Sequence, residues 1–158
     1  MRHHKYNPDF KFVKQPEEFN KYTDREVLQY CLGATMYMPG TKDFSQKILD
    51  HQLPGLTSMV FCFEDACPEG RVEEAEKNVI HVLDVLATAL DNGSLTYDDL
   101  PLIFCRVRSQ EQFIRFAGQL TKHHVKALTG INFPKFNAHN GNVYMFYLKQ
   151  LNEKFGEI

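Results

Sequence analysis

The sequence predicts an α/β fold built from parallel strands joined by helices. After residue 33, short apolar runs alternate four times with segments of helical spacing. The runs are apolar throughout rather than alternating, as strands buried on both faces require. About 125 residues hold the four units, roughly 31 residues each, which is the spacing of a (β/α)8 barrel. We therefore expect the first four βα units of such a barrel.

The chain begins with a segment that we expect to lie extended on the surface. Residues 1–16 are polar and aromatic and contain two prolines, so we assign them to an extended N-terminal arm. Residues 17–158 would then form the partial barrel domain. At its start, the apolar spacing between Glu17 and Tyr30 predicts a helix.

The four strand–helix units follow in order. Apolar runs predict strands at residues 34–38, 58–63, 102–107 and 125–133, and helical spacing predicts helices at 42–51, 69–90, 109–120 and 142–155. The residues Asp91-Asn92-Gly93 end the second of these helices, and Ser109 can cap the third. The apolar stretch 143–148 predicts a buried or interface helix.

Composition excludes several classes of function. The chain has 158 residues, 43% of them hydrophobic, and a formal net charge of −2. These values indicate one globular domain and argue against binding to a nucleic-acid backbone. Because no apolar run approaches the roughly 18 residues of a membrane span, we expect no membrane partner and a cytoplasmic location.

Cysteine and histidine give weak signals for chemistry. The four cysteines form no CxxC pair, and we interpret them as reduced, with redox or metal chemistry at Cys62 and Cys67 as the alternative. The pairs His3-His4 and His123-His124 lack the i, i+4 spacing of a helical zinc site. We therefore expect no metal site built from histidine.

Polar residues follow every predicted strand, where parallel α/β proteins gather their functional groups. They are Pro39-Gly40-Thr41 after the first strand, Glu64-Asp65 after the second, Arg106 and Arg108 at the third, and Pro134-Lys135 after the fourth. Neighbouring carboxylates and guanidinium groups could hold a divalent cation together with an anionic substrate.

Each of these residues also has a structural interpretation. Glu64 and Asp65 could cap the helix that follows them. Arg106 lies within an apolar strand, so it must either pair with a carboxylate such as Glu64 or bind a ligand anion. Arg108 could face solvent, and Lys135 could be an ordinary solvated lysine.

The strand ends also resemble a known family. Met36-Tyr37-Met38-Pro39-Gly40, Met59 to Ala66, Cys105-Arg106-Val107-Arg108 and Gly130 to Lys135 are similar, in order and spacing, to the first four strands of the HpcH/HpaI aldolase and citrate lyase β-subunit family. There the pieces read as a strand with VPG, a strand with LEDA, a VRVN strand and a GIxLPK strand. The resemblance covers about residues 33–158.

The resemblance implies a TIM-barrel carbon–carbon bond lyase or aldolase that acts with Mg²⁺ on an oxo-acid or acyl-CoA substrate. It implies that Arg106 grips the substrate carboxylate and that Glu64 and Asp65 order metal-bound water. Pro39, Gly40 and Thr41 would lie beside the substrate, with Arg108 and Lys135 as further contacts. The direct Mg²⁺ ligands of the family come from the fifth and sixth strands, and we therefore expect them beyond residue 158.

The sequence departs from the family pattern at two strand ends. Cys62 replaces an aspartate and Arg108 replaces the asparagine of VRVN, which suggests a divergent branch with a different substrate. The alternative function is a non-catalytic anion-binding or interaction module on a half-barrel.

Four strands alone would leave two open edges and an exposed apolar face. We expect either a longer gene product, pairing of two copies, or rearrangement into an open doubly wound sheet. The first is favoured, and a homo-oligomer is expected.

Overall fold

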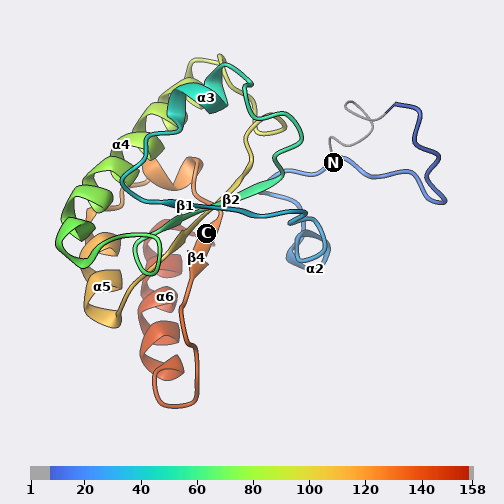
Figure 1. The fold of residues 1–158 in the computed structure, drawn as a ribbon. Coiled ribbons are helices and arrows are strands. Elements are labelled where there is room, and N and C mark those ends of the chain that lie inside the picture. Colours follow the sequence, from blue (N-terminus) through green and yellow to red (C-terminus); the bar gives the residue numbers. More distant parts are fainter. Residues whose placement is uncertain (1–7, 157–158) are drawn as a thin grey trace.

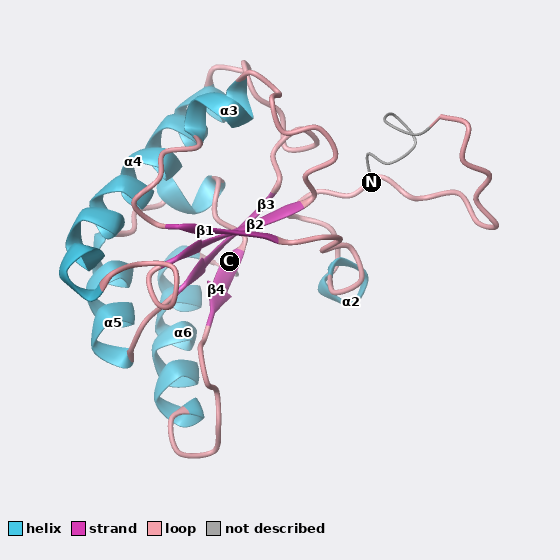
Figure 2. Cartoon of the chain, viewed as in Figure 1, coloured by secondary structure: helices cyan, strands magenta, loops and turns pink. Residues whose placement is uncertain are grey.

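The computed structural model describes residues 8–156, which contain one four-stranded parallel sheet. The strands are β1 (Met36–Pro39), β2 (Ser58–Cys62), β3 (Leu102–Arg106) and β4 (Gly130–Asn132). Their order in the sheet is β1-β2-β3-β4, and each pairs in parallel with the next. The predicted fold class is confirmed: the chain forms a partial α/β barrel (Figures 1 and 2).

Helical segments connect the strands. They are α2 (Arg25–Leu28), α3 (Ser45–Leu49), the 3-10 turn η1 (Glu69–Arg71), α4 (Val72–Asp91), α5 (Gln110–Gln119), the 3-10 turn η2 (His124–Lys126) and α6 (Gly141–Phe155). In Figure 1, α3 to α6 lie on one side of the sheet and α2 lies on the other. Only one face of the sheet is thus covered by the crossover helices.

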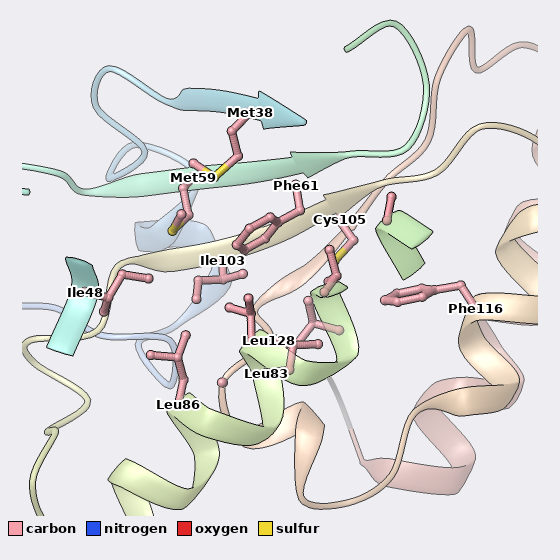
Figure 3. Packing of buried hydrophobic residues seen from close by; sticks show 14 of the residues in the cluster. Met38, Ile48, Met59, Phe61, Leu83, Leu86, Ile103, Cys105, Phe116 and Leu128 are labelled. Carbon is pink, nitrogen blue, oxygen red and sulfur yellow. The ribbon is translucent and has the colours of Figure 1, made fainter. Parts of the chain in front are cut away.

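The core lies between the sheet and the helices α4 and α5. Alternate strand side chains point toward these helices, where they meet apolar residues at helical spacing. The labelled members in Figure 3 include Met38, Met59, Phe61, Ile103 and Cys105 from the strands, with Leu83 and Leu86 from α4 and Phe116 from α5. Burial of each large side chain stabilises the fold by about 1.5–3 kcal/mol. Because successive side chains of a strand alternate, the remaining strand residues face the other side of the sheet.

The helix predicted over residues 17–30 is wrong for most of its length. Only α2 is helical, and Asp24 caps it by accepting a hydrogen bond from the Glu26 N–H. The apolar residues that suggested a longer helix, Tyr22, Val27 and Tyr30, are exposed. Although Tyr22 packs edge-on against the ring of Tyr97, these exposed residues bury too little apolar surface to stabilise a longer helix.

A lysine anchors this N-terminal segment to the residues that precede β4. Lys21 Nζ donates to the carbonyl oxygens of Val125 and Leu128 at 2.5 and 2.6 Å, and burial lowers the pKa of Lys21 to about 8.

The strand predicted over residues 125–133 is shorter in the structure. Residues 124–126 form η2, and only Gly130–Asn132 pair with β3.

The other predicted elements have these outcomes. The strands predicted at 34–38, 58–63 and 102–107 are present within two residues of their expected bounds. Residues 8–16 contain no helix or strand, and residues 1–7 of the predicted arm lie outside the described residues. In α6, Tyr144 and Leu151 are buried, whereas Met145 and Phe146 are exposed.

Two further expectations concern cysteines and membranes. All four cysteines are free thiols; Cys62, Cys67 and Cys105 are buried and Cys31 is partly exposed. Among the helices of residues 8–156, none has the length and apolar character needed to cross a bilayer.

The packing of Gly40 under α4 can be tested by mutation. A Cβ at this position would lie 3.0 Å from the Ala75 methyl group and 3.0 Å from the Phe63 ring. We expect Gly40→Ala to lower the free energy of unfolding by about 1–3 kcal/mol, because the neighbours would have to shift. Urea unfolding followed by circular dichroism measures the change.

The matched control is Gly118→Ala in α5, where an added Cβ meets nothing within 4 Å. It should leave stability unchanged or raise it by up to about 1 kcal/mol. Equal losses in both variants would contradict the close packing at Gly40.

Candidate functional site

One row of residues crosses the carboxyl end of the sheet on the face without crossover helices. Pro39, Cys62, Arg106 and Asn132 are aligned in register on the four strands. The residues one position earlier, Met38, Phe61, Cys105 and Ile131, pack on the helix side. Successive side chains on a strand point to opposite faces, so the row faces the other side.

Four charged side chains meet at the end of this row, and we call them the charged mouth: Glu64, Asp65, Arg106 and Lys135. Arg106 Nη2 contacts Glu64 Oε2 and lies 3.1 Å from Asp65 Oδ2. Lys135 Nζ lies 2.9 Å from Glu64 Oε1. Residues predicted separately from three strand ends are therefore in direct contact.

Burial differs sharply within the charged mouth. The Glu64 side chain is 7% exposed and that of Arg106 is 22% exposed, whereas that of Asp65 is 68% exposed. The contact with Glu64 raises the pKa of Lys135 above its ordinary value. Among the described residues, none gives the buried Glu64 Oε2 a well-angled hydrogen bond, so its compensation is the charge contact with Arg106.

The structure decides between two of the structural interpretations. The predicted ion pair of Arg106 with Glu64 is present. The capping interpretation of Glu64 and Asp65 is wrong, because η1 begins at Glu69 and the N-cap residue of α4 is Arg71. Whether Arg106 also binds a ligand stays a prediction.

Arg108 supports the loop that carries the two carboxylates. Its Nε donates to the Phe63 carbonyl at 2.9 Å, and its Nη2 donates to the carbonyls of Glu64 and Cys67 at 3.0 and 2.5 Å. A guanidinium donor serves three otherwise separate carbonyl groups in this way. The predicted substrate contact of Arg108 stays a prediction, and its observed contacts are with this loop.

An unusual backbone conformation presents Lys135. Its φ angle is +50°, in the left-handed region that non-glycine residues seldom adopt. The side-chain amides of Asn137 and Asn140 both donate to the Lys135 carbonyl, at 3.1 and 3.0 Å. These bonds offset the cost of the conformation, which is of order 1–3 kcal/mol, and they fix the backbone from which the lysine reaches Glu64.

The turn after β1 is held from within the protein. The Gly40 N–H donates to the Cys62 carbonyl at 3.0 Å, and the Gly40 carbonyl accepts from Asn78 Nδ2 at 2.7 Å. Pro39 and Thr41 are partly exposed beside it. Gly40 therefore has a packing role, and the contact of this turn with a substrate stays a prediction.

Sequence reasoning missed a pair of polar residues below the charged mouth. Asn132 Nδ2 donates to the Tyr37 hydroxyl at 2.9 Å, although 95 residues separate them in the sequence. Neither residue stood out, because Tyr37 lies in an apolar run and Asn132 in a short strand. Only the alternation of side chains along a strand could have indicated them, because it places both residues on the face opposite the core.

The described residues offer few ligands for a metal ion. Within residues 8–156, no group of three His, Cys, Asp or Glu side chains has a geometry that could hold a metal. Glu64 and Asp65 are both paired with Arg106. These residues alone do not fit direct coordination of Mg²⁺.

A cavity of about 650 Å³ lies away from the charged mouth. It is lined by the N-terminal segment, including Lys21 and Leu28, and by Leu102, Phe104 and Thr129. Leu102 and Thr129 are at the amino ends of their strands. Functional groups of parallel barrels gather at the carboxyl ends, so we place the candidate site at the charged mouth.

The fold and the charged mouth together define a class of protein: a parallel α/β barrel-type protein with a cluster of paired charges at its strand ends. A family model described as C-C_Bond_Lyase of the TIM-Barrel fold matches residues 26–158. The chain therefore belongs to this family of C–C bond lyases. The narrower resemblance to the HpcH/HpaI branch stays a prediction. No curated protein and no solved structure gives a significant match.

The support that Arg108 gives to the loop can be measured. We expect Arg108→Ala to lower the free energy of unfolding by about 2 kcal/mol, because three carbonyl groups lose a charged donor. Urea unfolding measures the loss. Arg71→Ala is the control, since Arg71 makes an exposed ion pair with Glu74 that contributes at most about 1 kcal/mol. Similar values for the two variants would show that the Arg108 contacts do not stabilise the loop.

Proposed function

We propose that the charged mouth is the substrate-binding end of a C–C bond lyase acting on an oxo-acid or acyl-CoA substrate. The observation that supports this most strongly is the position of Arg106, a partly buried guanidinium group at the end of a parallel strand. Guanidinium groups bind carboxylates through two parallel hydrogen bonds. A fixed cation near the reacting carbon would also stabilise the negative charge of an enolate.

The burial pattern suggests how a substrate could enter. Asp65 is mostly exposed and lies 3.1 Å from Arg106, and exposed ion pairs contribute little free energy. A substrate carboxylate could replace Asp65 on the guanidinium group while the buried Glu64 keeps its partner. The site would therefore accept an anion without leaving a buried charge unpaired.

The net charge of the site also favours an anionic substrate. Arg106, Arg108 and Lys135 all lie within contact of Glu64 or its backbone, against the two carboxylates of Glu64 and Asp65. The charged mouth itself holds two cations and two carboxylates, so Arg108, which contacts the loop backbone, adds the one excess positive charge, and such an excess attracts ligands of the opposite charge.

Mg²⁺ belongs to the proposal as an expected cofactor with a limited role for these residues. Mg²⁺ keeps several water ligands and is commonly held by one or two carboxylates together with the substrate. The exposed Asp65 could contact such a hydrated ion through water. Because the described residues do not form a direct site, no step of the reaction is assigned to the metal.

A second candidate function is a non-catalytic module that binds anions. The observation that favours it is that both Glu64 and Asp65 already pair with cations, which leaves no free base in contact with Arg106. Such a module would bind the same oxo-acids and would not change them. Binding and proton exchange therefore need separate measurements.

Binding is tested by calorimetric titration of the chain with pyruvate or oxaloacetate in the presence of Mg²⁺. We expect Arg106→Ala to weaken binding about tenfold or more, because a charged hydrogen-bond donor to the carboxylate is lost. Arg71→Ala, which removes an exposed arginine from η1, is the matched control. Equal affinities of wild type and Arg106→Ala would refute an anion site at this strand end.

Catalysis is tested by exchange of the pyruvate methyl protons in D₂O. An enzyme that forms an enolate removes a proton from the methyl carbon, and a deuteron from solvent returns to it, so no second substrate is needed. We expect proton NMR to show accelerated loss of the methyl signal with wild type and a much slower loss with Arg106→Ala. Binding without any acceleration would support the non-catalytic module instead.

A further inference from the structure

The face of the sheet without crossover helices, which we call the concave side, carries a polar bridge between the two outer strands. Tyr37 belongs to β1 and Asn132 to β4, and β2 and β3 lie between them. The hydrogen bond of 2.9 Å from Asn132 Nδ2 to the Tyr37 hydroxyl must therefore pass over the face of both middle strands. Met38 and Ile131, their sequence neighbours, pack on the helix side, which places the bridge on the opposite face.

The bridge lies next to Arg106. Asn132 is in register with Arg106 on the adjacent strand, and adjacent strands are about 4.8 Å apart. Tyr37 precedes Pro39, the β1 member of the row that contains Arg106, by two residues. Its hydroxyl nevertheless reaches this row, because it accepts a hydrogen bond from Asn132. The hydroxyl group thus lies on the same face of the sheet as Arg106 and is hydrogen-bonded to the residue next to it.

The chemistry of the bridge leaves one donor available. The Tyr37 oxygen accepts a hydrogen bond from Asn132, so its own O–H is free to donate to another acceptor. The tyrosine side chain is about half exposed, and the described contacts give the O–H no acceptor of its own. A donor held in this way by a neighbouring amide is suited to recognising an oxygen atom of a ligand.

From this geometry we propose that Tyr37, oriented by Asn132, determines specificity by donating a hydrogen bond to the keto oxygen of the oxo-acid whose carboxylate Arg106 binds. The proposal rests on the proposed function and assigns a substrate feature to it. In a 2-oxo-acid the keto oxygen is adjacent to the carboxylate, so a donor beside Arg106 meets it. Asn132 is a positioning residue, because it acts through the tyrosine hydroxyl.

The test compares two ligands that differ only at the keto group. Pyruvate and propionate are titrated into wild type, Tyr37→Phe and Asn132→Ala by calorimetry in the presence of Mg²⁺. We expect Tyr37→Phe to weaken pyruvate binding about fivefold, the effect of losing one hydrogen bond, and to leave propionate binding within about twofold. Asn132→Ala should give a smaller loss of the same selectivity, since the hydroxyl remains but is no longer oriented.

The control is Tyr22→Phe, which makes the same chemical change at an exposed tyrosine whose hydroxyl bonds to Tyr97. It should bind both acids as wild type does. An unchanged preference for pyruvate over propionate in Tyr37→Phe would overturn the inference, and so would an equal loss for both acids, which indicates a structural role.

The outcome with Arg106→Ala separates this inference from the proposed function. If Arg106→Ala loses both acids while Tyr37→Phe keeps its selectivity, the anion site stands and the role of Tyr37 is refuted. If wild type binds neither acid, or Arg106→Ala binds both normally, the proposed function fails and the inference fails with it. Circular dichroism of each variant confirms that the chain is folded.

Discussion

The charged mouth depends on one constraint, the need to compensate a nearly buried carboxylate at the end of β2. Glu64 is 7% exposed, and an unpaired charge at such a position would be strongly destabilising. Arg106 from β3 and Lys135 after β4 supply the compensation. Because each cation comes from a different strand end, the same carboxylate joins three consecutive strands at the edge where parallel α/β proteins carry their functional groups.

Two arginines separated by one residue have different surroundings in this arrangement. Arg106 ends β3 on the concave side and contacts carboxylates. Arg108 follows the buried Val107, and its guanidinium group turns back to three loop carbonyls. The first group could exchange an exposed carboxylate for a ligand, whereas the second would have to release three backbone carbonyl groups. An anion that replaced Asp65 on Arg106 would therefore leave the contacts of Arg108 with the loop unchanged.

Much of the fold could be predicted from the sequence, because the apolar pattern of the strands and the lengths of the helical crossovers both indicate a parallel sheet. Glu64, Asp65, Arg106 and Lys135 could be placed together from strand order alone. The structure of the segment before β1 could not be predicted, since Tyr22, Val27 and Tyr30 stay largely exposed and Lys21 anchors the segment instead. The bridge between Tyr37 and Asn132 also has no local signal, because it depends on how strongly four strands curve.

The hydrogen bond between Tyr37 and Asn132 also depends on the curvature of the sheet. In a flat sheet the first and fourth strands would be separated by about three strand spacings, roughly 14 Å, too far for one tyrosine and one asparagine to meet. Their contact at 2.9 Å requires the sheet to curl toward the face without crossover helices, as strands of a barrel do. The same hydrogen bond that frees the tyrosine O–H for a ligand thus spans the two outer strands. A substrate bound between Arg106 and Tyr37 would contact groups whose separation is set by the curvature of the sheet itself.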